Sequence, residues 1–298
     1  MTFVFVCAAK ISLFNQKMYL VLGWRIDFHY LCGNFRNRMK IKELVCALES
    51  FAPLPLQESY DNAGLQLGLT ESETTGALLC LDVTEPVIDE AIALGFNLIV
   101  SHHPLLFKGV KSISGSTYVE RCILKAIKND IAIYSAHTNL DNTVGGVNFK
   151  IAEKIGLRDV TFLTPSQNDG ISGSGIIGTL SEPETETDFL RRIKKLFEVG
   201  CLRHNKMTGR QIQRVAICGG AGAFLIPDAI AAAADVFITG EIRYHEYFGH
   251  EREILLAEIG HYESEQYTKE LLAEYLQRQF PGLKVEQTKI NTNPIKYL

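Results

Sequence analysis

The 298-residue sequence lacks several features that would place it in a broad class of protein. Its seven cysteines include no Cys-x-x-Cys pair, which argues against a zinc knot and for reduced thiols in a cytoplasm. No apolar run approaches the ~20 residues that span a bilayer, so we expect no membrane partner. The net charge of -4 leaves nucleic-acid binding unsupported, because it provides no basic footprint.

The first 38 residues differ in character from the remainder. The apolar stretch 3–9 stops at Lys10 and lacks the charged start and small-residue cleavage site of a secretory signal. From Met39 onward, apolar residues recur at the i, i+3, i+4, i+7 spacing of a helix. We therefore predict that Met39 is the native start, that 1–38 is a non-native extension, and that 39–298 is the domain.

Beyond that helix, short apolar runs alternate with amphipathic segments. The patterns predict strands at 77–81, 98–100, 131–135, 176–180, 254–257 and near 283–287, and helices at 86–94, 118–128, about 187–197 and about 263–277. Strands that alternate with helices are typical of right-handed β-α-β units around a largely parallel sheet. The fold class is therefore α/β.

The second half of the sequence repeats part of the first. A shift of 138 positions lays 77–103 over 215–241, and predicted strand, helix and strand coincide. We predict two duplicated α/β units, a first at about 39–150 and a second at about 170–298. His102-His103 and Gly240-Glu241 would then occupy equivalent strand ends, and the two units could face each other across a shared cleft.

Ser101-His102-His103-Pro104 follow directly on the apolar run 96–100. Open α/β sheets place their chemistry just beyond the carboxyl ends of such strands, where two adjacent imidazoles indicate metal ligands. The alternative is a pair of hydrogen-bonded polar residues in a loop. His261 and Glu265 are four residues apart at the start of a predicted helix, so both lie on one face. The alternative for this pair is a capping arrangement with surface charges.

The candidate ligands share the chemistry that borderline divalent cations accept. They are His102, His103, Asp141, His261 and Glu265. Three nitrogens and two carboxylates suit Zn, Mn, Fe or Co, and exceed what one catalytic zinc needs. The set therefore predicts two ions that share a carboxylate and activate a bound water, as in a hydrolase.

Other candidates carry two interpretations each. Gly220 and Gly222, in a glycine-rich loop, could cradle a phosphate or simply permit a tight turn. Lys108 could hold an anionic substrate or belong to a solvated loop. His137 and His245 could orient ligands.

Six ordered motifs resemble those of the Nif-three-like family, whose members are often called GTP cyclohydrolase 1 type 2 homologues. They are Tyr60-Asp61-Asn62-Ala63-Gly64-Leu65, Ser101-His102-His103-Pro104-Leu105 with Phe107-Lys108-Gly109, His137-Thr138-Asn139-Leu140-Asp141, Cys218-Gly219-Gly220-Ala221-Gly222, Thr239-Gly240-Glu241, and Gly260-His261 with Glu265. The resemblance covers 39–298. Asp61 and Glu241 lie in these motifs, and we expect them to support ligands or contact substrate.

The resemblance implies which ligands share an ion. His102, Asp141 and Glu265 would bind one metal, and His103, His261 and Glu265 the other, with Glu265 bridging. It also implies two interlocked α/β domains in a toroidal homohexamer with the metal sites facing its interior. Tyr60 stands where the family usually has Trp, which keeps an aromatic ring. The short segment 156–210 implies a form without the inserted middle domain.

The sequence therefore predicts a cytoplasmic, dinuclear metal-dependent hydrolase. Its substrate would be a small nucleotide-like or phosphate-bearing molecule, and the GTP cyclohydrolase label comes from the resemblance alone. The alternative is a metal-binding regulatory or scaffold ring protein without turnover. A nucleic-acid-binding accessory factor is a third interpretation, which the acidic balance does not favour.

Overall fold

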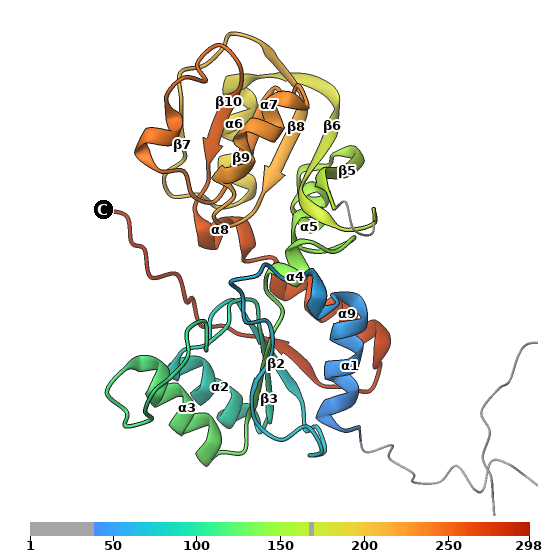
Figure 1. The fold of residues 1–298 in the computed structure, drawn as a ribbon, viewed down its shortest axis with the longest axis vertical. Helices are drawn as coiled ribbons and strands as arrows, with labels where there is room; N and C mark the ends of the chain where they lie inside the picture. The colour runs from blue at the N-terminus through green and yellow to red at the C-terminus, as the bar shows by residue number, and fades with distance from the viewer. Residues whose placement is uncertain (1–38, 167–169) are drawn as a thin grey trace, which may run out of the picture. The chain divides into compact units, whose positions relative to one another are not determined.

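The computed structural model describes residues 39–166 and 170–298 (Figure 1). The predicted non-native extension, 1–38, lies outside these described residues. Within them, no helix combines the length and apolarity needed to cross a membrane. None of the five cysteines in the described part of the chain forms a disulfide.

The first sheet has five strands in the order β1-β4-β3-β2-β11. Its strands are β1 (Gly64–Leu67), β2 (Ala77–Cys80), β3 (Leu98–Ser101), β4 (Ala132–Ser135) and β11 (Val285–Gln287). The four strands from β4 to β11 pair in parallel, and β1 joins the edge antiparallel to β4. β11 comes from the C-terminal part of the chain, so the sequence range predicted for the second unit supplies a strand to the first sheet.

Helices cover both faces of this sheet. They are α1 (Ile41–Phe51), α2 (Glu85–Leu94), α3 (Tyr118–Lys128) and α9 (Thr268–Gln279). Side chains of β2 alternate between the two faces, as strand geometry requires: Leu78 packs with α2 and α3, whereas Leu79 belongs to the core that contains α1 and α9. Figure 1 shows α1 beside α9, and the rings of Phe51 and Tyr275 stack at 4.5 Å between them.

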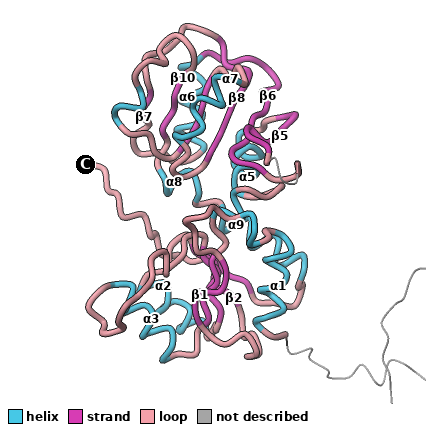
Figure 2. Tube along the Cα trace, viewed as in Figure 1, coloured by secondary structure: helices cyan, strands magenta, loops and turns pink. Residues whose placement is uncertain are grey.

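The second sheet has six strands in the order β5-β6-β8-β9-β10-β7. Its strands are β5 (Arg158–Pro165), β6 (Gly173–Thr185), β7 (Arg203–His204), β8 (Gln211–Cys218), β9 (Val236–Thr239) and β10 (Leu255–Glu258). β8, β9 and β10 pair in parallel at its centre, and the outer pairs are antiparallel. Figure 2 shows the strands gathered in two groups, as the strand orders require.

The remaining helices belong to the connections. They are η1 (Leu54–Leu56), α4 (Thr138–Asp141), α5 (Val147–Ile155), α6 (Glu186–Leu196), η2 (Ala223–Leu225), α7 (Ile226–Ala231), η3 (Tyr244–Tyr247) and α8 (His261–Glu265). The helix predicted at about 263–277 is two helices, because α8 ends before α9 begins at Thr268. β5 escaped prediction since most of its residues are exposed or half-buried and show no clear alternation.

The predicted duplication appears in the register of the strands. Ala77 of β2 pairs with Leu98 of β3, and 138 positions later Val215 of β8 pairs with Val236 of β9. In both copies the connection is helical, by α2 in the first and by η2 with α7 in the second. The α/β fold with two sheets that are parallel at their centres is thus confirmed.

Candidate metal centre

His102 and His103 follow the end of β3, as the sequence predicts. Their backbone N–H groups donate to the carbonyl oxygens of Cys80 and Leu81, at 3.2 and 2.9 Å, so the turn that carries them is tied to the end of β2. The His102 side chain is fully buried, and its Nδ1 lies 2.7 Å from the Ala136 carbonyl oxygen. Because a carbonyl oxygen only accepts, Nδ1 carries a proton, so the Nε2 lone pair is the one available to a cation.

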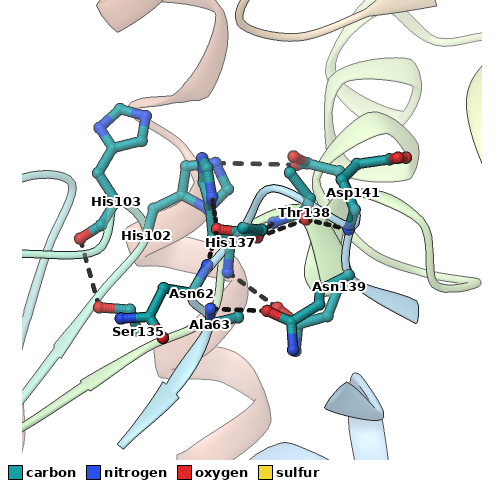
Figure 3. Close-up of polar contacts among 12 residues, drawn as sticks. Asn62, Ala63, His102, His103, Ser135, His137, Thr138, Asn139 and Asp141 are labelled. Carbon is teal, nitrogen blue, oxygen red and sulfur yellow. Dashed lines mark hydrogen bonds and ion pairs between the residues drawn. The ribbon is translucent and has the colours of Figure 1, made fainter. Parts of the chain in front are cut away.

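The first candidate group surrounds that lone pair. His102 Nε2 lies 3.7 Å from Asp141 Oδ1 and 3.6 Å from Glu265 Oε1, and it has no hydrogen-bond partner among the described residues. These separations are long for hydrogen bonds, but ligands held about 2.0–2.2 Å from one cation lie about 3–4 Å apart. Figure 3 shows Asp141, from α4, facing the His102 ring. A buried, unpaired nitrogen between two carboxylates fits a cation site.

The second candidate group lies beside the first. His103 Nε2 is 3.0 Å from Glu265 Oε2 and 3.2 Å from His261 Nε2, and His261 Nε2 is 3.1 Å from Glu265 Oε2. Two imidazole nitrogens that face each other across a carboxylate oxygen are a second set of donors on which one ion can be centred.

Glu265 belongs to both groups. Its Oε1 faces His102 and its Oε2 faces His103 and His261, so each oxygen faces a different group of candidate ligands. The residue is only 4% exposed, which contradicts the alternative of a surface charge on a capped helix. The short helix α8 places His261 and Glu265 one turn apart on the same face, as predicted.

Of the four histidines at this site, three have a carboxylate in contact with the Nδ1 atom of the ring. His103 Nδ1 lies 2.7 Å from Asp82 Oδ1, His261 Nδ1 lies 2.9 Å from Glu241 Oε1, and His137 Nδ1 lies 2.7 Å from Asp61 Oδ1. Such contacts fix the tautomer and ring orientation of a metal-binding histidine. Sequence reasoning missed Asp82, although it follows the end of β2 and the rule that singled out His102 also applies to it.

The charges of the candidate ligands compete strongly. Burial disfavours the charged form of His103, but Asp82 and Glu265 outweigh it and raise the pKa of His103 to about 10. Burial likewise opposes charging of His261, yet Glu265 raises its pKa to about 9. Burial raises the pKa of Asp141. Cations in the site would replace the protons that balance these carboxylates now.

Four of the five candidate ligands, all except the buried His102, line a pocket of about 430 Å³. It is lined by Glu58, Tyr60, His103, Pro104, Phe107, His137, Thr138, Asp141, Asn142, Asn148, Ser174, Gly175, Cys218, Gly219, Ala221, Phe224, His261 and Glu265. Three of these are exposed aromatic residues, Tyr60, Phe107 and Phe224. None of the described lining residues is Lys or Arg.

Two of the weaker candidates are not among the residues that line this pocket. Lys108 lines a separate pocket with Val110 and Thr117, not the one that contains the histidines. His245 makes ring contacts with Tyr244 and Phe248. Neither placement supports a role at the candidate ligands.

The glycine loop is a tight turn rather than a phosphate cradle. The N–H groups of Gly219, Gly220 and Gly222 already donate to Asn148, Ser264 and Thr239, so they are not free for a phosphate. Gly220 has a φ of 61°, and a Cβ there would overlap Glu265 Oε1. Glycine is therefore needed for the turn and for the close approach of the Glu265 carboxylate.

Known proteins are similar to this chain over most of its length. A family model described as Duf34/NIF3 (NGG1p interacting factor 3) matches residues 39–294. A Clostridium perfringens protein named GTP cyclohydrolase 1 type 2 homolog is 37% identical over 76% of this chain and 87% of its own length. A Lactococcus lactis protein of the same name is 33% identical over 86% of this chain and 98% of its own length.

Solved structures share the fold. A hypothetical protein from Staphylococcus aureus superposes with a TM-score of 0.81 at 31% identity, over 87% of this chain and 99% of that one. A Bacillus cereus protein related to NIF3 superposes with a TM-score of 0.80 at 25% identity, over 88% of this chain and 100% of that one. In the described part of this chain, the segment 156–210 folds into β5, β6, α6 and β7 and adds strands to the second sheet, which leaves no room in it for an inserted middle domain.

Proposed function

The chain belongs to the Duf34/NIF3 family, and on this premise we propose that it is a hydrolase that works with two divalent metal ions on a small molecule. When bound, such ions lower the pKa of water toward neutrality and offset negative charge that develops on the substrate. Zn, Mn, Fe and Co all suit the nitrogen and carboxylate donors.

A single observation carries this proposal: the buried carboxylate of Glu265 directs one oxygen at His102 and the other at His103 and His261. Asp141 completes the first group. A bridging carboxylate between two nitrogen donor sets is the arrangement that holds a pair of ions at short separation, and the pocket beside it gives a substrate access.

His137 is the candidate for moving a proton. It lines the pocket, and its Nδ1 is hydrogen-bonded to the Asp61 carboxylate. Nε2 is therefore the ring atom left to exchange a proton with substrate. Its ring lies 5.3 Å from that of His102 and 5.6 Å from that of His103, centre to centre. A His137→Gln variant that keeps its metal content but loses turnover would support this role.

The lining of the pocket favours a substrate with a flat ring. Tyr60 and Phe107 meet edge to face at 6.4 Å, and Phe224 adds a third exposed ring. Aromatic side chains bind planar groups by stacking. With no Lys or Arg among the described lining residues, the chain itself offers no cation for phosphate. A substrate with a nucleobase-like ring therefore fits better than a simple phosphate ester.

The first experiment measures metal content per chain on protein purified without chelators or a metal-binding tag. We expect about two divalent ions per chain, by analogy with other two-metal sites. Glu265→Gln should lose both, whereas Glu286→Gln, on the exposed strand β11, should keep them. A wild-type protein that binds no added Zn, Mn, Fe or Co would contradict the proposal.

The second experiment screens the loaded protein for hydrolysis of phosphoesters and for GTP ring opening. Turnover that disappears in Glu265→Gln supports the enzyme. Turnover that survives would remove the proposed mechanism. Two bound ions with no turnover on any substrate would instead favour the regulatory or scaffold protein.

We also propose that copies of the chain assemble into the homohexamer that the resemblance implies. Tyr244 and Phe248 are exposed on and beside η3, and burial between copies would remove their rings from water. Light scattering on the purified protein measures the assembly directly. A monomer at micromolar concentration would contradict it.

A further inference from the structure

The residues that follow β11 form an extended segment that reaches both halves of the candidate metal centre. We call residues 288–298 the C-terminal strap. Figure 1 shows it as a thread without helix or strand. It starts on the first sheet, where the Thr288 N–H donates to the Leu79 carbonyl oxygen at 2.8 Å and the Thr288 hydroxyl donates to Glu90 of α2.

At Thr292 the strap contacts the support of a candidate ligand. The Thr292 hydroxyl donates to Asp82 Oδ2 at 2.6 Å, and the other oxygen of the same carboxylate lies 2.7 Å from His103 Nδ1. Asp82 is therefore held on both sides. Since its side chain is one-third exposed, the carboxylate has room to rotate if the hydroxyl is removed.

The next residue contacts the other half of the centre. Asn293 Nδ2 donates to Glu263 Oε1 at 3.1 Å, and Glu263 lies in α8 between His261 and Glu265. Glu263 is itself buried. The Asn293 side-chain oxygen accepts from the Ile295 N–H at 2.9 Å, which fixes the orientation of the amide.

We propose that Thr292 is a positioning residue for His103 and that Asn293 has the same role for α8, so that the strap fixes the two ligand-bearing parts relative to each other. Adjacent strap residues join the end of β2, through Asp82, to the helix that carries His261 and Glu265. The effect that Thr292 and Asn293 would have on ion affinity rests on the proposed metal centre. The effect of Thr292 on the orientation of the His103 ring does not.

Thr292→Val tests the inference, because it keeps the shape of the side chain and removes the donor. In metal-free protein labelled with ¹⁵N-histidine, we expect the His103 Nδ1–H resonance to shift. In a Co²⁺ titration, we expect one of two ions to bind about tenfold more weakly while the other is unchanged, since loss of such support costs 10–100-fold. Thr292→Ser keeps the hydroxyl donor, so both readouts should match those of the wild type.

The matched control is Thr288→Val. It removes the same kind of bond, hydroxyl to carboxylate, from the same strap, but at Glu90, away from the candidate ligands. If it changes the His103 resonance as much as Thr292→Val does, the strap acts only as a general tether and the inference is wrong. An unchanged His103 resonance in Thr292→Val also overturns it. If wild-type protein binds no Co²⁺, the proposed function fails, and the resonance still decides the role of Thr292.

Discussion

The two copies of the duplicated unit share a backbone register but end differently. β3 is followed by His102-His103, whereas β9, its counterpart, is followed by Gly240-Glu241. The first copy supplies two candidate ligands. The second copy has no side chain at Gly240, where a Cβ would lie only 2.6 Å from the Gly220 carbonyl oxygen. Its Glu241 supports a candidate ligand, because the carboxylate contacts His261. The two copies thus share a scaffold, whereas the residues that follow their strands differ.

The comparison extends to the neighbouring turns. Asp82, after β2, supports His103, and 138 positions later Gly220, after β8, makes room for the Glu265 carboxylate. The third strands also correspond, because Leu98 pairs with Ala132 as Val236 pairs with Leu255. Each is followed by a short helix that carries a candidate ligand, α4 with Asp141 and α8 with His261 and Glu265.

The largest effect should come from filling the space that the second copy provides. In Gly220→Ala, the Cβ would displace the Glu265 carboxylate, so both ions should bind more than about tenfold more weakly. The positive φ adds about 1–2 kcal/mol of destabilisation. Gly95→Ala is the control, since Gly95 has a φ of 69° and nothing within 4 Å of its Cβ position. Metal content should fall only in Gly220→Ala, and equal losses would contradict the explanation.

The next effect concerns the support of His137 in the first copy. Burial opposes ionisation of Asp61, but His137 and Thr138 hold the pKa of its carboxyl at about 2. A lowered pKa stabilises the fold above the ordinary value of 3.8, and this contribution disappears as pH falls toward 2. Asp61→Asn should cost about 2 kcal/mol at pH 7, from the shift of nearly two pKa units.

Urea unfolding of wild type and Asp61→Asn at pH 7 and at pH 3 measures this difference. The gap in unfolding free energy should be full at pH 7 and smaller at pH 3. A gap that grows with acid would show that the carboxylate is not the stabilising form.

A smaller effect compares the two supporting carboxylates. Asp82 is one-third exposed and held by Thr292, whereas Glu241 is 58% exposed. Asp82→Ala should therefore weaken binding of one ion by about tenfold, and Glu241→Ala by less. Calorimetric titration with Zn²⁺ or Mn²⁺ gives both affinities. A larger loss of ion affinity in Glu241→Ala than in Asp82→Ala would contradict the expectation that Asp82 is the more firmly held support.

The smallest effect lies at the ends of the two equivalent helices. Gly95 ends α2 with a φ of 69°, and Ala233, 138 positions later, has a φ of 53° after α7. Alanine in this left-handed conformation costs about 1 kcal/mol more than glycine. Ala233→Gly should thus raise the free energy of unfolding by about that amount in urea. If the free energy of unfolding does not rise, the extra freedom of glycine in the unfolded chain cancels the relief of backbone strain in the folded state.

The sequence alone determined the alternating strands and helices, the duplication and the strand ends that carry His102 and His103. These follow from hydrophobic periodicity and from spacing, which are local properties of the chain. The spacing of His261 and Glu265 likewise placed them on one helical face.

Only the tertiary structure decided what those residues meet. Asp82 and Thr292 are 210 positions apart, and His103 and Glu265 are 162 apart, yet each pair is in contact. The structure also places β11 in the first sheet, pairs the N–H groups of the glycine loop with side chains of other segments, and leaves Lys108 and His245 out of the lining of the pocket. Periodicity records which side of an element is buried. Contacts between distant elements depend on how the sheets and connections pack, which no local pattern records.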